Sequence, residues 1–243
     1  MENKEYTLAT GDSGAYRLQI LNKIHQPYTE FLLARAGLSS GMRVADIGCG
    51  TGNVSFLIAS KVRVEGSVCG VDISEAQLDI ARSQAKNSNF NNISFVGGSA
   101  YNTGLSKESF DLVYCRYVLI HLNRPLEALL EMKSLLKPVG LLVCEEADFG
   151  KAFCEPSSQA HDRCYEMLIG LAKERGQNFC LGIELYKMFQ DAGFISPDIS
   201  FIQPVVDGEN KRLIDMSLME ARNTLIEAGL TVSDEVDEII FQL

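Results

Sequence analysis

A glycine turn between an apolar stretch and a helical one constrains the fold of this chain more than any other feature. Val44-Ala45-Asp46-Ile47 is a short, mainly apolar run that suits a buried strand. It continues into Gly48-Cys49-Gly50-Thr51-Gly52, whose alternating glycines permit positive φ angles and let a ligand approach the backbone closely. A helix is expected to begin near residues 51–54, with its free N–H groups facing the turn. The pattern favours a strand–turn–helix unit that holds a ligand over a tight turn without one.

Composition limits the class of protein to which this unit belongs. The chain has 243 residues, of which 46% are hydrophobic and 22% charged, and this suits one α/β domain with a sizeable core. The net charge of −10, with Lys211-Arg212 as the only basic pair that stands out, is unfavourable for binding DNA or RNA. We therefore expect no nucleic-acid partner.

The cysteines and the hydropathy pattern bear on the cellular setting. None of the seven cysteines forms a C-x-x-C pair, so a zinc site is not expected. Their odd number and the lack of a visible signal peptide predict a reducing, cytoplasmic environment. No apolar run approaches the roughly 18 residues needed to span a bilayer, and we expect no membrane partner.

Strand-like and helix-like segments alternate through the middle of the chain. Ser74-Glu75-Ala76-Gln77 is a capping box at the start of one of these helices. Strands are expected at 43–47, 67–72, 93–96, 110–115 and 139–145, and helices at 52–62, 74–86 and 123–136. This alternation predicts a parallel sheet with helices on both faces, in which ligands bind beyond the carboxyl ends of the strands.

The two ends of the chain depart from this alternation. Residues 15–36 have helical periodicity, and Pro27 predicts two helices or a kink there. Tyr16 and Arg17 of this segment either reach a substrate or pack at the surface. The further expected elements are an amphipathic helix around 164–172, a helix at 183–192, a strand at 198–206, a long helix ending at Gly229 and a last helix capped by Ser233.

The spacing of the glycines separates two cofactor classes. Dinucleotide-binding turns usually read G-x-G-x-x-G, whereas this chain has G-x-G-x-G after Asp46, with Asn53 in place of the last Rossmann glycine. In this the chain resembles the first motif of class I S-adenosylmethionine-dependent methyltransferases, over about residues 40–147. Within that class it looks most like the small-molecule enzymes.

The resemblance implies a Rossmann-like three-layer sandwich with a mostly parallel sheet, extra N-terminal helices and a helical insertion after strand five. Residues 1–40 would form an N-terminal helical lid. Residues 41–243 would form the methyltransferase domain, with a substrate cap at about 151–192. The class normally has a seventh, antiparallel strand, for which this sequence offers no good candidate.

The same resemblance implies the residues that bind S-adenosylmethionine. Asp72, at the end of the second strand, would accept hydrogen bonds from the ribose hydroxyls, and Ile73 would pack on the adenine. Ser99 stands where the class often has an aspartate beside the adenine, and carbonyls near Cys115 and Arg116 would face the ammonium group. The expected cofactor site comprises Asp46, Gly48, Cys49, Gly50, Gly52, Asn53, Asp72, Ile73, Ser99, Ala100, Cys115 and Arg116.

The expected chemistry is methyl transfer to an oxygen or nitrogen nucleophile of a small molecule by in-line displacement. His121 is the candidate general base, although a histidine in an apolar run is often structural. Tyr16, Arg17, Tyr117 and Glu146 are the candidate substrate residues, and no metal is expected. A regulatory protein that binds the cofactor without catalysis and a nicotinamide-dependent oxidoreductase remain as alternatives. The sequence is compatible with a homodimer.

Overall fold

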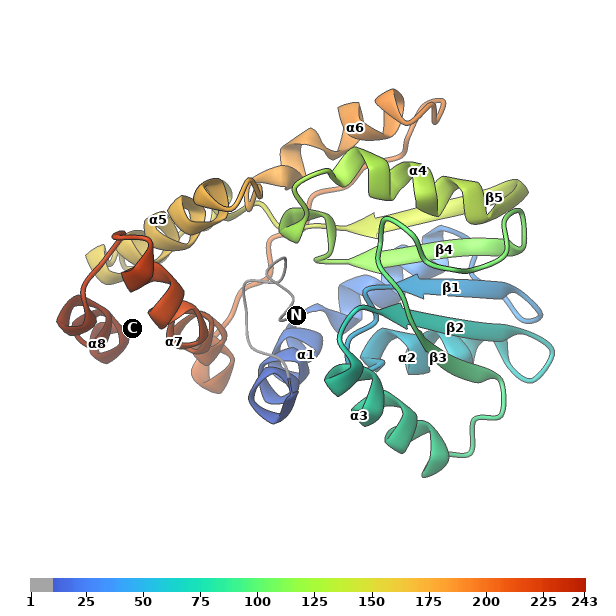
Figure 1. Cartoon of the computed structure of the whole chain (residues 1–243), viewed down its shortest axis with the longest axis horizontal. Coiled ribbons are helices and arrows are strands. Elements are labelled where there is room, and N and C mark those ends of the chain that lie inside the picture. Colours follow the sequence, from blue (N-terminus) through green and yellow to red (C-terminus); the bar gives the residue numbers. More distant parts are fainter. Residues whose placement is uncertain (1–10) are drawn as a thin grey trace.

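A parallel sheet of five strands forms the centre of the computed structural model, which describes residues 11–243 and side chains from residue 14 onward (Figure 1). The strands run in the spatial order β3-β2-β1-β4-β5, and every neighbouring pair is parallel. They are β1 (Arg43–Ile47), β2 (Ser67–Asp72), β3 (Ile93–Gly97), β4 (Phe110–Arg116) and β5 (Leu136–Glu145). The order reverses between β1 and β4, which is where ligands bind in open sheets of this kind. The expected α/β fold is confirmed.

Alternate residues of the central strands supply two separate cores. Val44 of β1 and Leu112 of β4 pack with α2 (Asn53–Val62) on one face of the sheet. Ala45 of β1 and Val113 of β4 point to the other face, where α4 (Pro125–Leu135) covers them. Because both faces are buried, the central strands are nearly continuous in apolar residues. Helix, sheet and helix form the three layers.

Hydrogen bonds in the turn between β2 and α3 (Glu75–Lys86) fix the conformation at the end of β2. The Ser74 hydroxyl accepts a hydrogen bond from the Gln77 N–H at 3.4 Å, so the expected helix cap is present. The Ser74 N–H donates to Asp72 Oδ1 at 2.9 Å instead of to the Gln77 side chain, so the box is only half of the usual motif.

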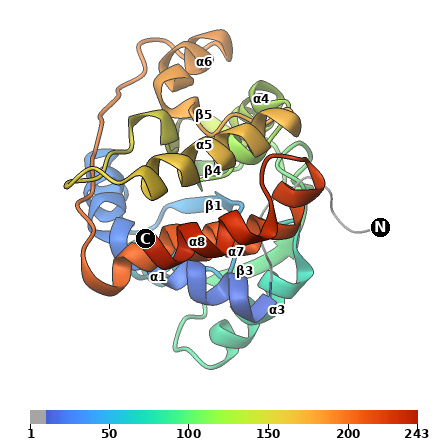
Figure 2. The ribbon, with the colours of Figure 1, turned by 90° about the vertical axis from the view of Figure 1, so that its left-hand side faces the viewer.

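Helices that follow β5 gather beside the carboxyl ends of the strands. These are α5 (Gln159–Glu174), α7 (Arg212–Glu227) and α8 (Ser233–Gln242), which pack on one another, whereas α6 (Leu185–Asp191) lies against α4 (Figures 1 and 2). Short 3-10 turns occur at Leu119–His121, Phe149–Lys151, Leu181–Glu184 and Gly208–Lys211. No helix among residues 11–243 combines the length and apolarity that crossing a membrane requires.

The N-terminal segment forms one helix, α1 (Gly11–Arg35), so of the two alternatives expected at Pro27, two helices or a kink, the first is wrong. Ile20 and Ile24 before Pro27 and Leu33 after it are all buried, and this packing outweighs the hydrogen bond that proline removes. Residues 1–10 of the expected lid lie outside the described residues.

The strand expected at 198–206 is wrong, because this segment makes no ladder with β5. Pro197 and Pro204 lack the N–H donors that pairing would need, and Phe201 between them is 74% exposed. Within residues 11–243 the sheet therefore ends at β5 and has no sixth or seventh strand. The expected cap at Ser233 is also wrong, because α8 begins at this residue and its hydroxyl contacts Arg222.

Candidate active site

The glycine turn connects β1 to α2 and lies directly against the end of β2. The N–H groups of Gly48 and Cys49 donate to the Val71 carbonyl at 2.7 and 3.0 Å. A Cβ atom at Gly48 would come within 2.3 Å of the Val118 side chain, and one at Gly52 within 2.7 Å of the Phe95 ring. Because both residues also have positive φ, the turn keeps its shape only with glycine there.

Asp72 joins the end of β2 to the glycine turn. Its Oδ2 accepts a hydrogen bond from the Gly50 N–H at 2.8 Å, while Oδ1 accepts from Ser74. Burial raises the pKa of this carboxyl group, against the effect of these backbone donors. The neighbouring Ile73 is 47% exposed and offers an apolar surface beside the carboxylate.

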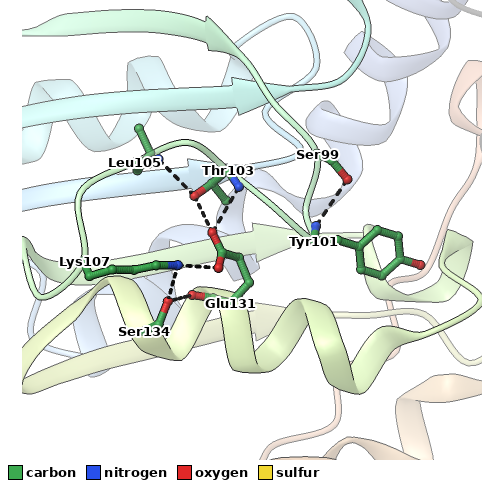
Figure 3. Close-up of polar contacts among 7 residues, drawn as sticks. All are labelled: Ser99, Tyr101, Thr103, Leu105, Lys107, Glu131 and Ser134. Atoms are coloured by element: carbon green, nitrogen blue, oxygen red, sulfur yellow. Dashed lines mark hydrogen bonds and ion pairs between the residues drawn. The ribbon is translucent and has the colours of Figure 1, made fainter.

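The loop after β3 lies beside Asp72 and is held in a defined shape. The Gly98 N–H donates to the Asp72 carbonyl at 3.0 Å, and Ser99 and Asn102 exchange backbone hydrogen bonds. The Ser99 hydroxyl accepts from the Tyr101 N–H at 3.3 Å (Figure 3). Ser99 and Ala100 therefore present a fixed surface next to the end of β2.

Asp46 is buried within the β1 end of the site. Its Oδ2 accepts the Ser55 hydroxyl at 2.5 Å, so the side chain ties β1 to the first turn of α2. Burial raises the pKa of Asp46 to about 7, although Ser55 and Arg116 act in the opposite direction. A cationic group bound nearby would favour the ionised form of this carboxyl.

The end of β4 contacts α1 through a polar network. The Arg116 guanidinium donates to Asn22 Oδ1 and to the Thr29 hydroxyl, both at 3.0 Å. Thr29 in turn donates to Glu145 Oε2 at 3.1 Å. Cys115 lies in the sheet interior and is fully buried.

Tyr117 follows β4 with a φ of +55°, a conformation that is uncommon outside glycine and is typical of functional sites. Its hydroxyl lies 3.0 Å from His25 Nε2 of α1, and the two rings meet edge to face. Burial, followed by the charge of Arg116, lowers the pKa of His25 to about 4, so that this imidazole is neutral at pH 7. Burial raises the pKa of Tyr117, so its hydroxyl keeps its proton.

Glu146 holds the turn that carries His121. Its carboxylate accepts the N–H groups of Val118, Leu119 and Ile120 at 3.0, 2.8 and 3.4 Å. Burial raises the pKa of Glu146 to about 8, against the effect of these three donors. The contacts that the structure gives this residue are therefore those of a brace for the backbone.

His121 is nearly buried, and its ring meets Phe179 edge to face at a centroid distance of 5.1 Å. Its carbonyl accepts from the Gln177 side chain at 2.7 Å. Burial lowers the pKa of His121 to about 3, with smaller contributions from Arg17 and Arg175. A ring with this environment is a poor proton acceptor at neutral pH.

The two candidates on α1 have different surroundings. Arg17 is buried, and its Nε donates to Glu220 Oε2 of α7 at 2.8 Å. Tyr16 is 50% exposed. The Arg17–Glu220 pair therefore fastens α1 to α7, and Tyr16 lies on the outer surface.

A cavity of about 1990 Å³ opens at the carboxyl ends of the strands and extends between α1, α5 and the segment 194–207. The expected site residues that line it are Arg17, Gly48, Gly50, Asp72, Ile73, Ser99, Ala100, Arg116, Tyr117, His121 and Glu146. A recess of about 50 Å³ shares Gly48, Gly50 and Arg116 with this cavity and adds Asp46, Cys49 and Asn53. Three expected site residues, Tyr16, Gly52 and Cys115, are not among the described residues that line the cavity or the recess.

Sequence reasoning missed a polar stripe on α1 and an aromatic cluster in the cavity. Asn22, His25 and Thr29 are three or four residues apart and face the strand ends together. This helical spacing of polar residues was the available signal.

The rings of Phe149, Tyr165 and Phe179 meet edge to face in the cavity wall, and nothing in the sequence brings these distant residues together. Among the described residues, no cluster of three or more His, Cys, Asp or Glu could hold a metal ion.

Comparison with known proteins adds an independent observation. A family described as "methyltransferase domain" matches residues 38–193. A demethylmenaquinone methyltransferase of Staphylococcus aureus is 28% identical over 193 residues, which cover 71% of this chain and 76% of that protein. An uncharacterized methyltransferase of Schizosaccharomyces pombe is 37% identical over 126 residues, but the match spans 49% of this chain and only 45% of the relative.

Solved structures of similar fold include two of bacterial origin. The YcgJ protein of Bacillus subtilis superimposes with a TM-score of 0.61 at 22% identity and covers 90% of this chain and 83% of its own. A methyltransferase of Aquifex aeolicus described as S-adenosylmethionine-dependent has a TM-score of 0.54 at 21% identity, covering 68% and 78%. The fold, the glycine turn and the family match agree, and the chain therefore belongs to the S-adenosylmethionine-dependent methyltransferases.

Proposed function

We propose that this enzyme transfers the methyl group of S-adenosylmethionine to a small molecule that has an apolar body and an oxygen or nitrogen nucleophile. The observation that carries the proposal is the continuity of the main cavity, which runs from Asp72 and the glycine turn to the aromatic wall at Phe149 and Phe179. Its volume of about 1990 Å³ exceeds the roughly 300–1,000 Å³ of a pocket for one drug-sized ligand. There is thus room for a cofactor and an acceptor together.

The residues near β2 fit the nucleoside part of S-adenosylmethionine. Asp72 gives one lone pair of each oxygen to a backbone N–H, and the remaining lone pairs can accept the two ribose hydroxyls. The exposed side chain of Ile73 and the loop at Ser99 and Ala100 bound the adjacent space for the adenine. Gly50, whose N–H donates to Asp72, lies against Leu18 of α1, where an added Cβ would come within 3.1 Å of that side chain.

The carboxylates of the site suit the cationic end of the cofactor. Asp46 lines the recess beside the glycine turn, and Glu145 and Glu146 follow β5. Burial raises the pKa of Asp46 to about 7 and of Glu146 to about 8, so a sulfonium or ammonium group bound beside them would favour their ionised forms. When bound, S-adenosylmethionine supplies an electrophilic methyl group on its sulfonium sulfur.

The chain itself contributes alignment and the exclusion of water, which are the main requirements of an in-line displacement. The Tyr117 hydroxyl and the neutral His25 ring form a hydrogen-bonding pair in the cavity wall that can orient the nucleophile, and the pKa of about 4 makes His25, like His121, a poor proton acceptor at neutral pH. His121 remains the other candidate base. The low pKa of its buried ring and its distance from solvent make it the weaker choice.

Calorimetric titration with S-adenosylhomocysteine tests the cofactor half of the proposal. We expect binding by the wild-type chain, a large loss of affinity in Asp72→Ala, and no binding of NADH. The loss should be on the order of 100- to 10,000-fold, because two hydrogen bonds to a charged acceptor disappear. Absence of binding to the wild-type chain would refute the assignment.

Methyl transfer is then measured with methyl-labelled S-adenosylmethionine and a panel of a naphthoquinol, a catechol, a simple phenol and an alkylamine. Tyr117→Phe should reduce transfer to the best acceptor, whereas Tyr16→Phe, which alters a tyrosine outside the cavity wall, should not. Binding of S-adenosylhomocysteine without transfer to any acceptor would instead favour a regulatory protein. Equal loss in both tyrosine variants would contradict the assignment of Tyr117.

A further inference from the structure

We propose that Glu131 of α4 is a positioning residue that sets the nucleobase end of the cofactor site through the loop 98–103. The inference rests on the proposed cofactor site. Glu131 is not among the described residues that line the cavity or the recess, so its effect must pass through the loop.

Glu131 holds the loop at a single residue, Thr103 (Figure 3). Its Oε1 accepts both the Thr103 N–H at 3.0 Å and the Thr103 hydroxyl at 2.8 Å. The Thr103 hydroxyl also accepts the Leu105 N–H at 3.3 Å, and Thr103 as a whole is buried. One carboxylate oxygen therefore satisfies the backbone and the side chain of a residue that solvent does not reach.

The second oxygen of Glu131 is fixed from the other side. It forms an ion pair with Lys107, whose ammonium group also donates to the Ser134 hydroxyl at 2.8 Å. Burial disfavours the charge on Glu131, but the Lys107 ammonium and the Thr103 donors outweigh it and lower the pKa of this carboxyl. Glu131 is therefore ionised at any ordinary pH. A carboxylate accepts hydrogen bonds from Thr103 more strongly than a neutral carboxyl group would.

The position of Thr103 is transmitted to Asp72 through the backbone. A Cβ at Gly98 would lie 2.8 Å from the Thr103 carbonyl, so these two segments are in direct contact. Ser99 and Asn102 exchange hydrogen bonds between them, and the Gly98 N–H donates to the Asp72 carbonyl at 3.0 Å. Moving Thr103 therefore moves Ser99 and Ala100 relative to Asp72, that is, the wall of the proposed adenine site relative to the ribose-binding carboxylate.

The test compares three variants by calorimetric titration with S-adenosylhomocysteine and with its 6-oxo analogue, S-inosylhomocysteine. Glu131→Ala removes both hydrogen bonds to Thr103 and should weaken S-adenosylhomocysteine binding about tenfold. Glu131→Gln keeps a carbonyl acceptor for Thr103, while the exposed Lys107 can turn to solvent, and its affinity should stay within about twofold of wild type. Asp191→Ala, which breaks an exposed ion pair on α6, is the control and should change nothing.

The ratio of the affinities for S-adenosylhomocysteine and S-inosylhomocysteine distinguishes a positioning role of Glu131 from a general loss of structure. A displaced loop 98–103 should lower this ratio in Glu131→Ala, and Glu131→Gln should restore it. Equal loss of affinity for both ligands in Glu131→Ala, or a Gln variant as weak as the Ala variant, would overturn the positioning role. Failure of wild type to bind S-adenosylhomocysteine would overturn the proposed cofactor site and this inference with it.

Discussion

The buried ring of His121 predicts how the stability of this protein depends on pH. Burial, with Arg17 and Arg175 contributing less, lowers its pKa from 6.5 to about 3 in the folded state. Below pH 6.5 the unfolded chain therefore binds a proton that the folded chain refuses until about pH 3. The stabilising contribution is present in full above pH 6.5 and is lost progressively as the pH falls toward 3.

The size of the effect follows from the two pKa values of His121. At pH 4.5, two pH units below the unfolded value, the linkage relation gives a loss of about 2.7 kcal/mol from this residue. The limiting loss below pH 3 is about 5 kcal/mol. The residue is only 8% exposed, so solvent screening does little to reduce these figures. His25, whose pKa burial lowers to about 4, contributes a similar loss independently.

Urea unfolding of wild type and His121→Gln at pH 7.0 and pH 4.5 measures this contribution. The quantity of interest is the change in unfolding free energy between the two pH values, because the substitution alters stability at both. The variant should lose about 2–3 kcal/mol less than wild type on acidification. His161→Gln, a change of the same residue type on α5, serves as the control. If His121→Gln and wild type lose the same free energy, the ring is not held neutral by burial and the reasoning is refuted.

Two further predictions concern the attachment of α1 and the glycine turn. Arg17→Met removes the Arg17 guanidinium from the buried Glu220 carboxylate and should lower the unfolding free energy by about 3–5 kcal/mol, which Arg17→Met/Glu220→Leu should largely restore. A single-variant loss below about 1 kcal/mol in urea unfolding would contradict this. Gly52→Ala places an alanine at a backbone position with a φ of +84°, where its Cβ meets the Phe95 ring. It should lower the unfolding free energy by about 1–2 kcal/mol and weaken S-adenosylhomocysteine binding. Gly229→Ala, with a similar φ but open space, should cost less, and an equal cost would show that the contact with Phe95 is unimportant.

Local patterns predicted the central part of the fold because the forces that shape it act over short stretches of chain. The strands that include Val44, Val68 and Leu112 are nearly continuous in apolar residues because helices cover both faces, and the glycine turn needs the conformations that glycine allows. Pro27 does not divide α1 into two helices, because its local penalty is smaller than the stabilisation from the packing of Ile24 and Leu33. The apolar residues near Phe201 led to the wrong prediction of a strand at 198–206. A strand needs a neighbouring strand to pair with, and the two flanking prolines lack the backbone N–H donors for such pairing.

The sequence by itself determined the parallel α/β core, the glycine turn and the acidic end of β2, since each depends on neighbouring residues and on the periodicity of strands and helices. Only the tertiary structure decided which polar groups meet at the site. His25 pairs with Tyr117, Glu131 holds Thr103, and Glu146 braces the turn of His121. These contacts join residues separated by about 25 positions or more, and nothing in local propensity specifies them. They arise when the helices pack on the sheet and buried polar groups must find partners.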